Sequence, residues 1–277
     1  MSWRSLLFVP GHRIELLAKV PRCRPDAVIV DLEDAVAEPD KETAREALAK
    51  VDLAVAGCPV IVRVNAPGTP WHDDDVAACV AGSGVASILV PKAEDPAVVA
   101  GLARRLEGSG REIGLLLGIE SALGIARARE LLATPGVDGA YFGSEDFLVD
   151  MGGRRTAGGL ELLYARSEVV LAGRLAGVPV IDQAVVSVED DAAFTADAEA
   201  GRALGYAGKL CVHPRQVPLA NAAFSPTDAE VAAARRVLEA TADGVAVLDG
   251  QMVDAVHIRL ARRVLERAGE AAPTNSE

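Results

Sequence analysis

The feature of this sequence that most restricts its fold is a regular alternation of short apolar runs with longer segments of helical pattern. Eight runs rich in Val, Ile and Leu occur at Ser5–Val9, Ala27–Leu32, Val60–Val64, Ser87–Val90, Ile113–Ile119, Gly139–Gly143, Val178–Ile181 and Gly208–Val212. Helical spacing is found between them, at Pro39–Val51, Asp73–Ala81, Pro96–Glu107, Leu123–Leu132, Leu160–Ala176 and Ala192–Leu204. Strands that alternate with helices build βα units around a parallel sheet.

Each of the eight predicted strands ends in polar or ionisable residues. Among them are His12, Asp31, Glu33, Asn65, Lys92, Glu120, Glu145, Asp146, Asp182 and His213. In a (β/α)8 barrel all strand ends converge on the face that carries the active site, whereas a doubly wound open sheet binds ligands mainly at its switch point. We therefore predict an α/β fold, a (β/α)8 TIM barrel over residues 1–222 with a C-terminal helical extension over residues 223–277.

The predicted extension differs in pattern from the barrel. Two helical segments, Thr227–Thr241 and Met252–Arg267, flank a short link with a turn at Ala246–Gly250. A polar tail, Gly269–Glu277, follows, and we expect about its last eight to ten residues to be disordered.

Composition and charge exclude several classes of protein. Half of the residues are hydrophobic and only 4% are aromatic, which provides a large aliphatic core. The formal net charge of −12 argues against nucleic-acid and anionic-membrane partners, because both require a basic surface. The apolar run before Pro10 is too short for a signal peptide, and no stretch is long enough to span a membrane, so we expect a cytoplasmic protein.

Glu120 and Asp146 are the candidate metal ligands. Glu120 directly follows one apolar run, and Asp146 follows the next along the chain. Two carboxylates suit a hard cation that keeps several waters and takes further oxygens from a substrate, which describes Mg2+ better than Ca2+ or Zn2+. The alternative is that each carboxylate caps the helix that follows it.

Asp31, Glu33 and Arg63 lie at the ends of the second and third predicted strands. By alternation, Asp31 and Glu33 face one side and suit a role around the same metal, although they could instead cap the helix near Pro39. Arg63 stands in a run that should be buried, where an unpaired guanidinium is costly. It therefore needs a neighbouring carboxylate or an anionic oxygen of a substrate.

The remaining charged strand-end residues allow two interpretations each. Lys92 could lie in the pocket or along its rim, and His12 and His213 are best read as hydrogen-bonded rim residues. Arg154, Arg155 and Arg166 form either a phosphate-binding patch or surface ion pairs. There is no Walker A sequence and no GxGxxG after a strand, so nothing indicates a nucleotide site.

A family resemblance extends over nearly the whole chain. The strings LLFVPG, VIVDLEDAV, IVRVN, VPKAED, GIES, FGSEDF, RTAGGLELLYARSEVVLAGRLAGVPVIDQ, KLCVHPRQV and DGQMVD occur in this order. Together they resemble the citrate lyase β-subunit-like group of the HpcH/HpaI aldolase superfamily. The resemblance implies a trimeric (β/α)8 barrel that carries out Mg2+-dependent aldol-type cleavage or condensation of carboxylated acyl thioesters.

The resemblance also implies roles for the strand-end residues. It makes Glu120 and Asp146 the metal ligands, with Asp31 and Glu33 orienting metal-bound water. Arg63 would stabilise the carbonyl oxygen that becomes an enolate. We assign substrate binding to four residues, which are Arg63, Lys92, Gly143 and His213.

One catalytic residue is expected from the predicted extension. The aspartate of the Met-Val-Asp string, here Asp254, would be the acid/base at the α-carbon of the thioester and would act in the site of a neighbouring subunit. Ala255–Val256 departs from the family pattern, in which a proline often follows this aspartate.

The expected function is a carbon–carbon lyase. With Mg2+ it would cleave or form a malyl-, citramalyl- or citryl-type CoA thioester, giving acetyl-CoA or another acyl-CoA and a 2-oxo acid, and it would be a homotrimer. One alternative is a citrate lyase β subunit that depends on partners and acts on a carrier-protein thioester. Another is an HpaI-type aldolase acting on free pyruvate and aldehydes, for which Asp254 would be dispensable.

Overall fold

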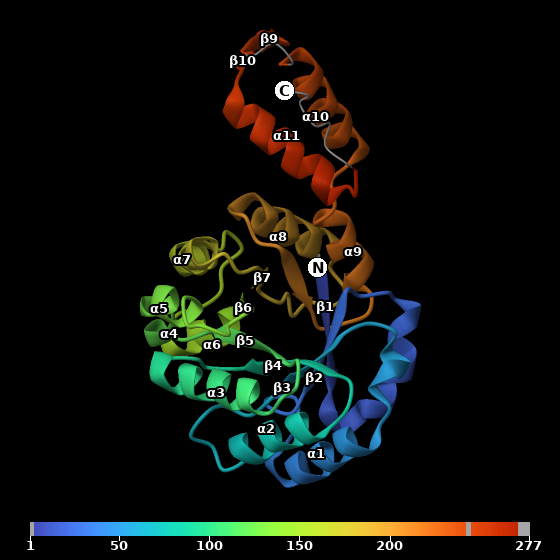
Figure 1. The fold of residues 1–277 in the computed structure, drawn as a ribbon, viewed down its shortest axis with the longest axis vertical. Coiled ribbons are helices and arrows are strands. Elements are labelled where there is room, and N and C mark those ends of the chain that lie inside the picture. Colours follow the sequence, from blue (N-terminus) through green and yellow to red (C-terminus); the bar gives the residue numbers. More distant parts are fainter. Residues whose placement is uncertain (1–2, 242–244, 271–277) are drawn as a thin grey trace. The chain divides into compact units, whose positions relative to one another are not determined.

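Eight parallel strands form a closed barrel in which every strand pairs with its neighbours in chain order and β8 pairs with β1 (Figure 1). The computed structural model describes residues 3–241 and 245–270. The strands are β1 (Ser5–Pro10), β2 (Ala27–Asp31), β3 (Val60–Arg63), β4 (Val85–Val90), β5 (Gly114–Ile119), β6 (Gly139–Phe142), β7 (Val180–Asp182) and β8 (Gly208–Cys211). The predicted TIM barrel is thereby confirmed.

Helices surround the strands (Figure 1). They are α1 (Lys41–Lys50), α2 (His72–Ala81), α3 (Pro96–Gly108), α4 (Ala122–Ala126), α5 (Ala128–Leu132), α6 (Ser144–Asp150), α7 (Leu160–Ala176), α8 (Asp191–Leu204) and α9 (Gln216–Ala223). Between β1 and β2 the chain forms a 3-10 helix, η1 (Gly11–Arg22), and two shorter ones are η2 (Glu38–Asp40) and η3 (Leu53–Ala56). The predicted helix Leu123–Leu132 is two helices, because Arg127 between them has φ −105° and ψ 9°.

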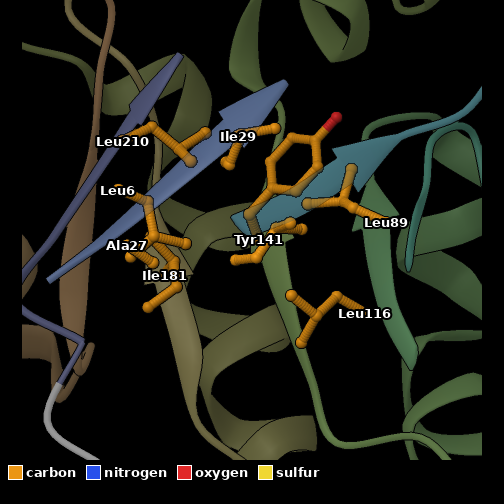
Figure 2. Packing of buried hydrophobic residues seen from close by; sticks show 9 residues of the cluster. Leu6, Ala27, Ile29, Leu89, Leu116, Tyr141, Ile181 and Leu210 are labelled. Carbon is orange, nitrogen blue, oxygen red and sulfur yellow. The ribbon is translucent and has the colours of Figure 1, made fainter. Parts of the chain in front are cut away.

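The barrel interior is filled by side chains that alternate along the strands. Buried residues from all eight strands meet there, namely Leu6, Ala27, Ile29, Ile61, Leu89, Leu116, Tyr141, Ile181 and Leu210 (Figure 2). Successive strand residues point to opposite faces, so these positions lie two apart where one strand contributes twice. The alternation therefore fixes which strand-end residues lie directly above the core.

The described chain divides into two compact units, residues 3–221 and the residues from 222 onward. The second unit contains α10 (Asp228–Ala240) and α11 (Ala255–Arg267), which pack through Ala234, Ala261 and Leu265. It also contains an antiparallel hairpin, β9 (Ala246–Leu248) and β10 (Gln251–Val253). The hairpin was predicted as a link and the start of a helix.

The hairpin turn explains this difference. Asp249 and Gly250 both have positive φ, 52° and 79°, which is the two-residue turn that joins tightly paired strands. From residue 271 onward, the tail that was predicted to be disordered lies outside the residues that the structure describes. None of the helices described is both long and apolar enough to cross a membrane.

Candidate active site at the barrel mouth

Strand alternation places three charged side chains and one glycine directly above the barrel core. Asp31 and Arg63 lie two residues beyond the interior residues Ile29 and Ile61, and the two charged residues are paired in register. Glu120 follows the last residue of β5, and Gly143 lies two residues beyond interior Tyr141. The structure thus brings together most of the residues that the sequence pointed to.

Arg63 and Asp31 form a buried bidentate ion pair. Arg63 Nε lies 2.7 Å from Asp31 Oδ1, and Nη2 lies 2.6 Å from Oδ2. The Asp31 carboxylate also accepts the backbone N–H groups of Glu33 and Ala35, at 2.9 and 3.0 Å. Burial opposes its ionisation, but the charge and hydrogen bonds of Arg63 hold the pKa of Asp31 below its ordinary value. Of the two partners expected for Arg63, the structure contains the neighbouring carboxylate.

Glu33 is the second carboxylate beside Arg63. Its Oε2 lies 3.0 Å from Arg63 Nη1, and its Oε1 accepts a hydrogen bond of 2.6 Å from Lys92 Nζ. Burial raises the pKa of Glu33 to about 7, although both cations favour the ionised form. Helix capping, the alternative for this residue, is wrong, because the N-cap residues of η2 and α1 are Ala37 and Asp40.

Lys41 holds the loop that carries Glu33 through hydrogen bonds to its backbone. No role for this residue was predicted from the sequence. Lys41 Nζ donates to the backbone oxygens of Leu32 and Glu33, at 3.0 and 2.9 Å, and to Oδ1 of Asn65 at 2.6 Å. The Lys41 side chain is buried, whereas lysine side chains are ordinarily exposed.

Glu120 is fully buried with both carboxylate oxygens engaged. Oε1 accepts the backbone N–H of Lys92 at 2.6 Å, and Oε2 accepts the Tyr141 hydroxyl at 2.5 Å. Capping by Glu120 is wrong, because Ser121 Oγ accepts the Gly124 N–H at the start of α4. Burial raises the pKa of Glu120, the Tyr141 hydrogen bond opposes the rise, and the nearby charge of Asp146 adds to it.

Asp146 and Lys92 complete the cluster. Asp146 lies in the first turn of α6, half-buried, and makes no capping hydrogen bond. Lys92 Nζ lies 3.7 Å from Asp146 Oδ1 and 3.6 Å from Asp34, in addition to its bond to Glu33. Lys92 has φ 49°, a left-handed conformation that is uncommon outside glycine. The side chain of Lys92 is 38% exposed and is not part of the cavity lining, so of the two positions left open for Lys92 it takes the one along the rim.

A cavity of about 400 Å³ opens above these residues. Its charged wall includes Asp31, Arg63, Glu120 and Asp146, and its apolar wall includes Phe8, Ala184, Val186, Leu210 and Val212. The Phe8 ring lies 5.0 Å from the Arg63 guanidinium carbon. Gly143 also lines the cavity, and a Cβ there would collide with the Glu120 carboxylate.

Several predicted residues lie elsewhere. Asp182 was grouped with the strand-end residues at the mouth, but Ile181 faces the interior and Asp182 faces the helices. There it pairs with Lys209 and with Arg166 in a fully buried network. The phosphate-patch interpretation of Arg166 is therefore wrong, because its guanidinium is already paired inside the protein.

The other predicted residues, His12, His213, Arg154 and Arg155, lie on the surface. His213 is exposed in the loop after β8, where Nδ1 accepts the Arg215 N–H at 3.2 Å, and the cavity lining includes its neighbour Val212 instead. His12 is exposed as well. Arg155 pairs with Glu145, as the surface interpretation expected.

Asp254 belongs to the second unit and is the N-cap residue of α11. Its Oδ1 accepts the Val256 N–H at 2.9 Å and lies 2.9 Å from Nδ1 of His257. The hydrogen bond with His257 lowers the pKa of Asp254, so this carboxylate is ionised in neutral solution. Its predicted catalytic role, like the roles of the barrel residues, stays a prediction.

Comparison with known proteins identifies the family. The model of the HpcH/HpaI aldolase/citrate lyase family matches residues 4–214, and a model of C–C bond lyases of the TIM-barrel fold matches residues 173–270. A citrate lyase subunit beta-like protein of Deinococcus radiodurans is 46% identical, covering 95% of this chain and 96% of its own. A (3S)-malyl-CoA thioesterase of Cereibacter sphaeroides is 36% identical, covering 96% and 94%.

A solved structure is similar over nearly the full length. It is CitE of Mycobacterium tuberculosis in complex with magnesium, acetoacetate and coenzyme A, with a TM-score of 0.83, 33% identity and coverage of 96% of this chain and 98% of that one. The chain described here belongs to the HpcH/HpaI aldolase/citrate lyase family and is a carbon–carbon lyase of the TIM-barrel fold.

Proposed function

We propose that this protein is a Mg2+-dependent lyase that cleaves, or forms, a 3-hydroxy-3-carboxyacyl-CoA thioester of the malyl-, citramalyl- or citryl-CoA type. The products of cleavage are acetyl-CoA, or another acyl-CoA, and a 2-oxo acid. The observation that carries this proposal is one cavity in which the paired carboxylates Glu120 and Asp146 lie beside the buried guanidinium of Arg63. The related CitE structure with magnesium and coenzyme A supports it.

The donor set fits Mg2+. Each oxygen of Glu120 accepts one hydrogen bond and so keeps a lone pair, and Asp146 Oδ1 lies 3.7 Å from the ammonium of Lys92. Two nearby carboxylates repel each other unless a cation lies between them. No group of three or more His, Cys, Asp or Glu residues within the described chain is arranged to hold a metal ion. Two protein carboxylates with water and substrate oxygens are typical of Mg2+.

Cleavage breaks the bond between the α-carbon of the thioester and the carbon that bears the hydroxyl group. The hydroxyl proton passes to solvent water, the oxygen becomes the carbonyl of the 2-oxo acid, and the released electron pair forms a thioester enolate. Bound Mg2+ supplies a positive charge that polarises the substrate oxygens. Arg63 places a fixed positive charge beside the enolate oxygen, and its ion pair with Asp31 keeps it in that position.

We assign the proton transfer at the α-carbon to Asp254 of a neighbouring subunit. Its ionised carboxylate takes the α-proton of the acyl-CoA in the condensation direction, and in cleavage the same group, after taking up a proton, returns it to the enolate. Asp31 and Glu33 would orient water around a bound metal, and Lys92, Gly143 and His213 are the proposed contacts to the substrate. Exposed apolar side chains on α7 support assembly with further copies of the chain. Leu160, Tyr164 and Leu175 are 77%, 77% and 66% exposed. We propose a cytoplasmic homotrimer.

The decisive assay incubates the purified protein with malyl-CoA, citramalyl-CoA and citryl-CoA, with and without Mg2+. We expect one of them to give equal amounts of acyl-CoA and 2-oxo acid only with Mg2+, and Glu120→Ala to abolish the reaction. If all three thioesters stay intact, the proposal is wrong. Activity on free pyruvate and aldehydes would favour an HpaI-type aldolase, and activity only on a carrier-protein thioester would favour a citrate lyase β subunit.

Thioester hydrolysis is a second candidate function, supported by the similarity to a (3S)-malyl-CoA thioesterase. The same assay separates the two activities. A hydrolase releases free coenzyme A and the hydroxy acid, whereas the lyase leaves the thioester bond intact and releases a 2-oxo acid.

Mixing two inactive variants tests whether Asp254 acts across subunits. We expect Asp254→Ala and Glu120→Ala each to be inactive alone. After mixed reassembly, some sites combine an intact barrel with an intact Asp254, so activity should return. An inactive mixture in which mixed oligomers are demonstrated would contradict the proposal.

A further inference from the structure

Tyr141 occupies an unusual position for a core residue. Its ring comes from β6 and packs in the barrel interior among Leu89 and Ile29, while its hydroxyl points away from Leu116 and Ile181 (Figure 2). The residue is 3% exposed, and its hydroxyl donates to Glu120 Oε2 at 2.5 Å. One side chain therefore joins the apolar core of the barrel to the carboxylate at its mouth.

Two glycines shape the space for this contact. A Cβ at Gly118 would lie 2.8 to 2.9 Å from atoms of the Tyr141 ring and hydroxyl, so the phenol rests against bare backbone. A Cβ at Gly143 would collide with the Glu120 carboxylate. The other oxygen of Glu120 is held by the Lys92 N–H at 2.6 Å. The carboxylate is thus fixed at both oxygens, within a space that allows it little movement.

We infer that Tyr141 is a positioning residue that fixes the orientation of the Glu120 carboxylate for Mg2+. This inference rests on the proposed function, in which Glu120 binds the metal. A phenylalanine would fill the core equally well but would leave Oε2, a buried carboxylate oxygen, without its donor. The Tyr141 hydroxyl donates to one lone pair of Oε2 and leaves the other lone pair free to bind the cation. Hydrogen-bond partners of metal ligands typically strengthen metal binding about 10- to 100-fold.

Tyr206 provides a matched control. It is 1% exposed, and its hydroxyl donates to the backbone oxygen of Arg166 at 2.7 Å, in the helix layer rather than at the barrel mouth. Tyr206→Phe removes a buried phenol hydrogen bond of the same kind. A loss of Mg2+ affinity caused only by general loosening of the fold would appear in both variants.

The experiment measures Mg2+ binding to the metal-free, full-length protein by isothermal titration calorimetry. We expect Tyr141→Phe to raise the Kd for Mg2+ about 10- to 100-fold, and Tyr206→Phe to leave it within about twofold. Saturating Mg2+ should restore most of the lyase rate of Tyr141→Phe. If Tyr141→Phe does not fold, Gly118→Ala tests the same contact by displacing the ring, and it too should weaken Mg2+ binding.

The outcomes separate this inference from the proposed function. A wild-type protein that binds no Mg2+ overturns the metal site and this inference with it. A wild-type protein that binds Mg2+, with a Tyr141→Phe variant of equal affinity, overturns the inference alone. Equal weakening in both tyrosine variants also overturns it, because the effect would then be one of general stability.

Discussion

Replacing Asp31 with Asn tests how strongly the buried ion pair stabilises the barrel. Asp31 is 1% exposed and accepts four hydrogen bonds, two from Arg63 and two from backbone N–H groups. Asparagine keeps the shape but removes the charge, and its amide N–H2 group meets donors. Removing one partner of a buried ion pair typically costs about 3–5 kcal/mol. Since Glu33 remains 3.0 Å from the guanidinium, we expect the lower end, about 3 kcal/mol.

Asp26→Asn is the matched control, because Asp26 also holds an arginine at two nitrogens. Arg4 Nη2 lies 2.8 Å from Asp26 Oδ1, but the two side chains are 35% and 15% exposed, so we expect a loss of about 1 kcal/mol. Urea unfolding followed by tryptophan fluorescence suits the comparison, since Trp3 and Trp71 are the only tryptophans and both lie in the barrel unit.

The pH dependence of the same variant gives a second test. The folded-state pKa of Asp31 is lowered, so its stabilisation is present above the ordinary carboxyl pKa and is lost as the pH falls through the folded-state value. The difference in stability between wild type and Asp31→Asn should therefore close in acid. Equal losses for Asp31→Asn and Asp26→Asn in neutral solution would refute the reasoning.

Three further predictions concern the same region. Gly143→Ala should abolish Mg2+ binding measured by calorimetry, because its Cβ would collide with the Glu120 carboxylate, whereas Gly101→Ala, with open space around it, should have no effect. In the metal-free protein, Glu33 has a folded-state pKa of about 7, which is above its ordinary value of 4.5. Its contribution to stability is therefore fully present below pH 4.5, and about 3 kcal/mol of stability is lost as the pH rises from 4.5 to about 7. Urea unfolding across this pH range should show a fall in stability that is smaller by about this amount in Glu33→Gln than in wild type. Lys41→Met should lower the urea midpoint and kcat together, since two buried hydrogen bonds to the loop after β2 and one to Asn65 after β3 are lost.

The sequence predicts the barrel and many of the residues at its mouth, because the two-residue period of a strand shows which way each side chain points as well as where the strand lies. Asp31 and Arg63 follow interior residues at a spacing of two, so their place above the core could be inferred. The same rule shows why Asp182 was misplaced. Asp182 comes directly after Ile181, which faces the barrel interior, so the Asp182 side chain points to the opposite face of the strand and pairs with Lys209. The predicted strand ended at Ile181, whereas β7 includes Asp182.

The features that the sequence could not predict depend on backbone conformation or on contacts across the fold. The amino-acid sequence does not show that the backbone of Lys92 has a left-handed conformation. This conformation lets the backbone N–H of Lys92 reach Glu120 while its ammonium reaches Glu33. Tyr141 was missed for a different reason. An aromatic residue in an apolar strand is ordinarily part of the core, and only the position of Glu120 at the end of the neighbouring strand β5 reveals the use of its hydroxyl.

The charge at the barrel mouth connects these observations to metal binding. Five carboxylates, those of Asp31, Glu33, Asp34, Glu120 and Asp146, lie around the two cations Arg63 and Lys92. When all are ionised the cluster carries an excess negative charge, and the raised pKa values of Glu33 and Glu120 reflect it together with burial. A divalent cation would relieve part of this repulsion. Mg2+ should therefore stabilise the folded barrel and favour the ionised form of Glu33, so the fall in stability with rising pH should shrink when Mg2+ is bound.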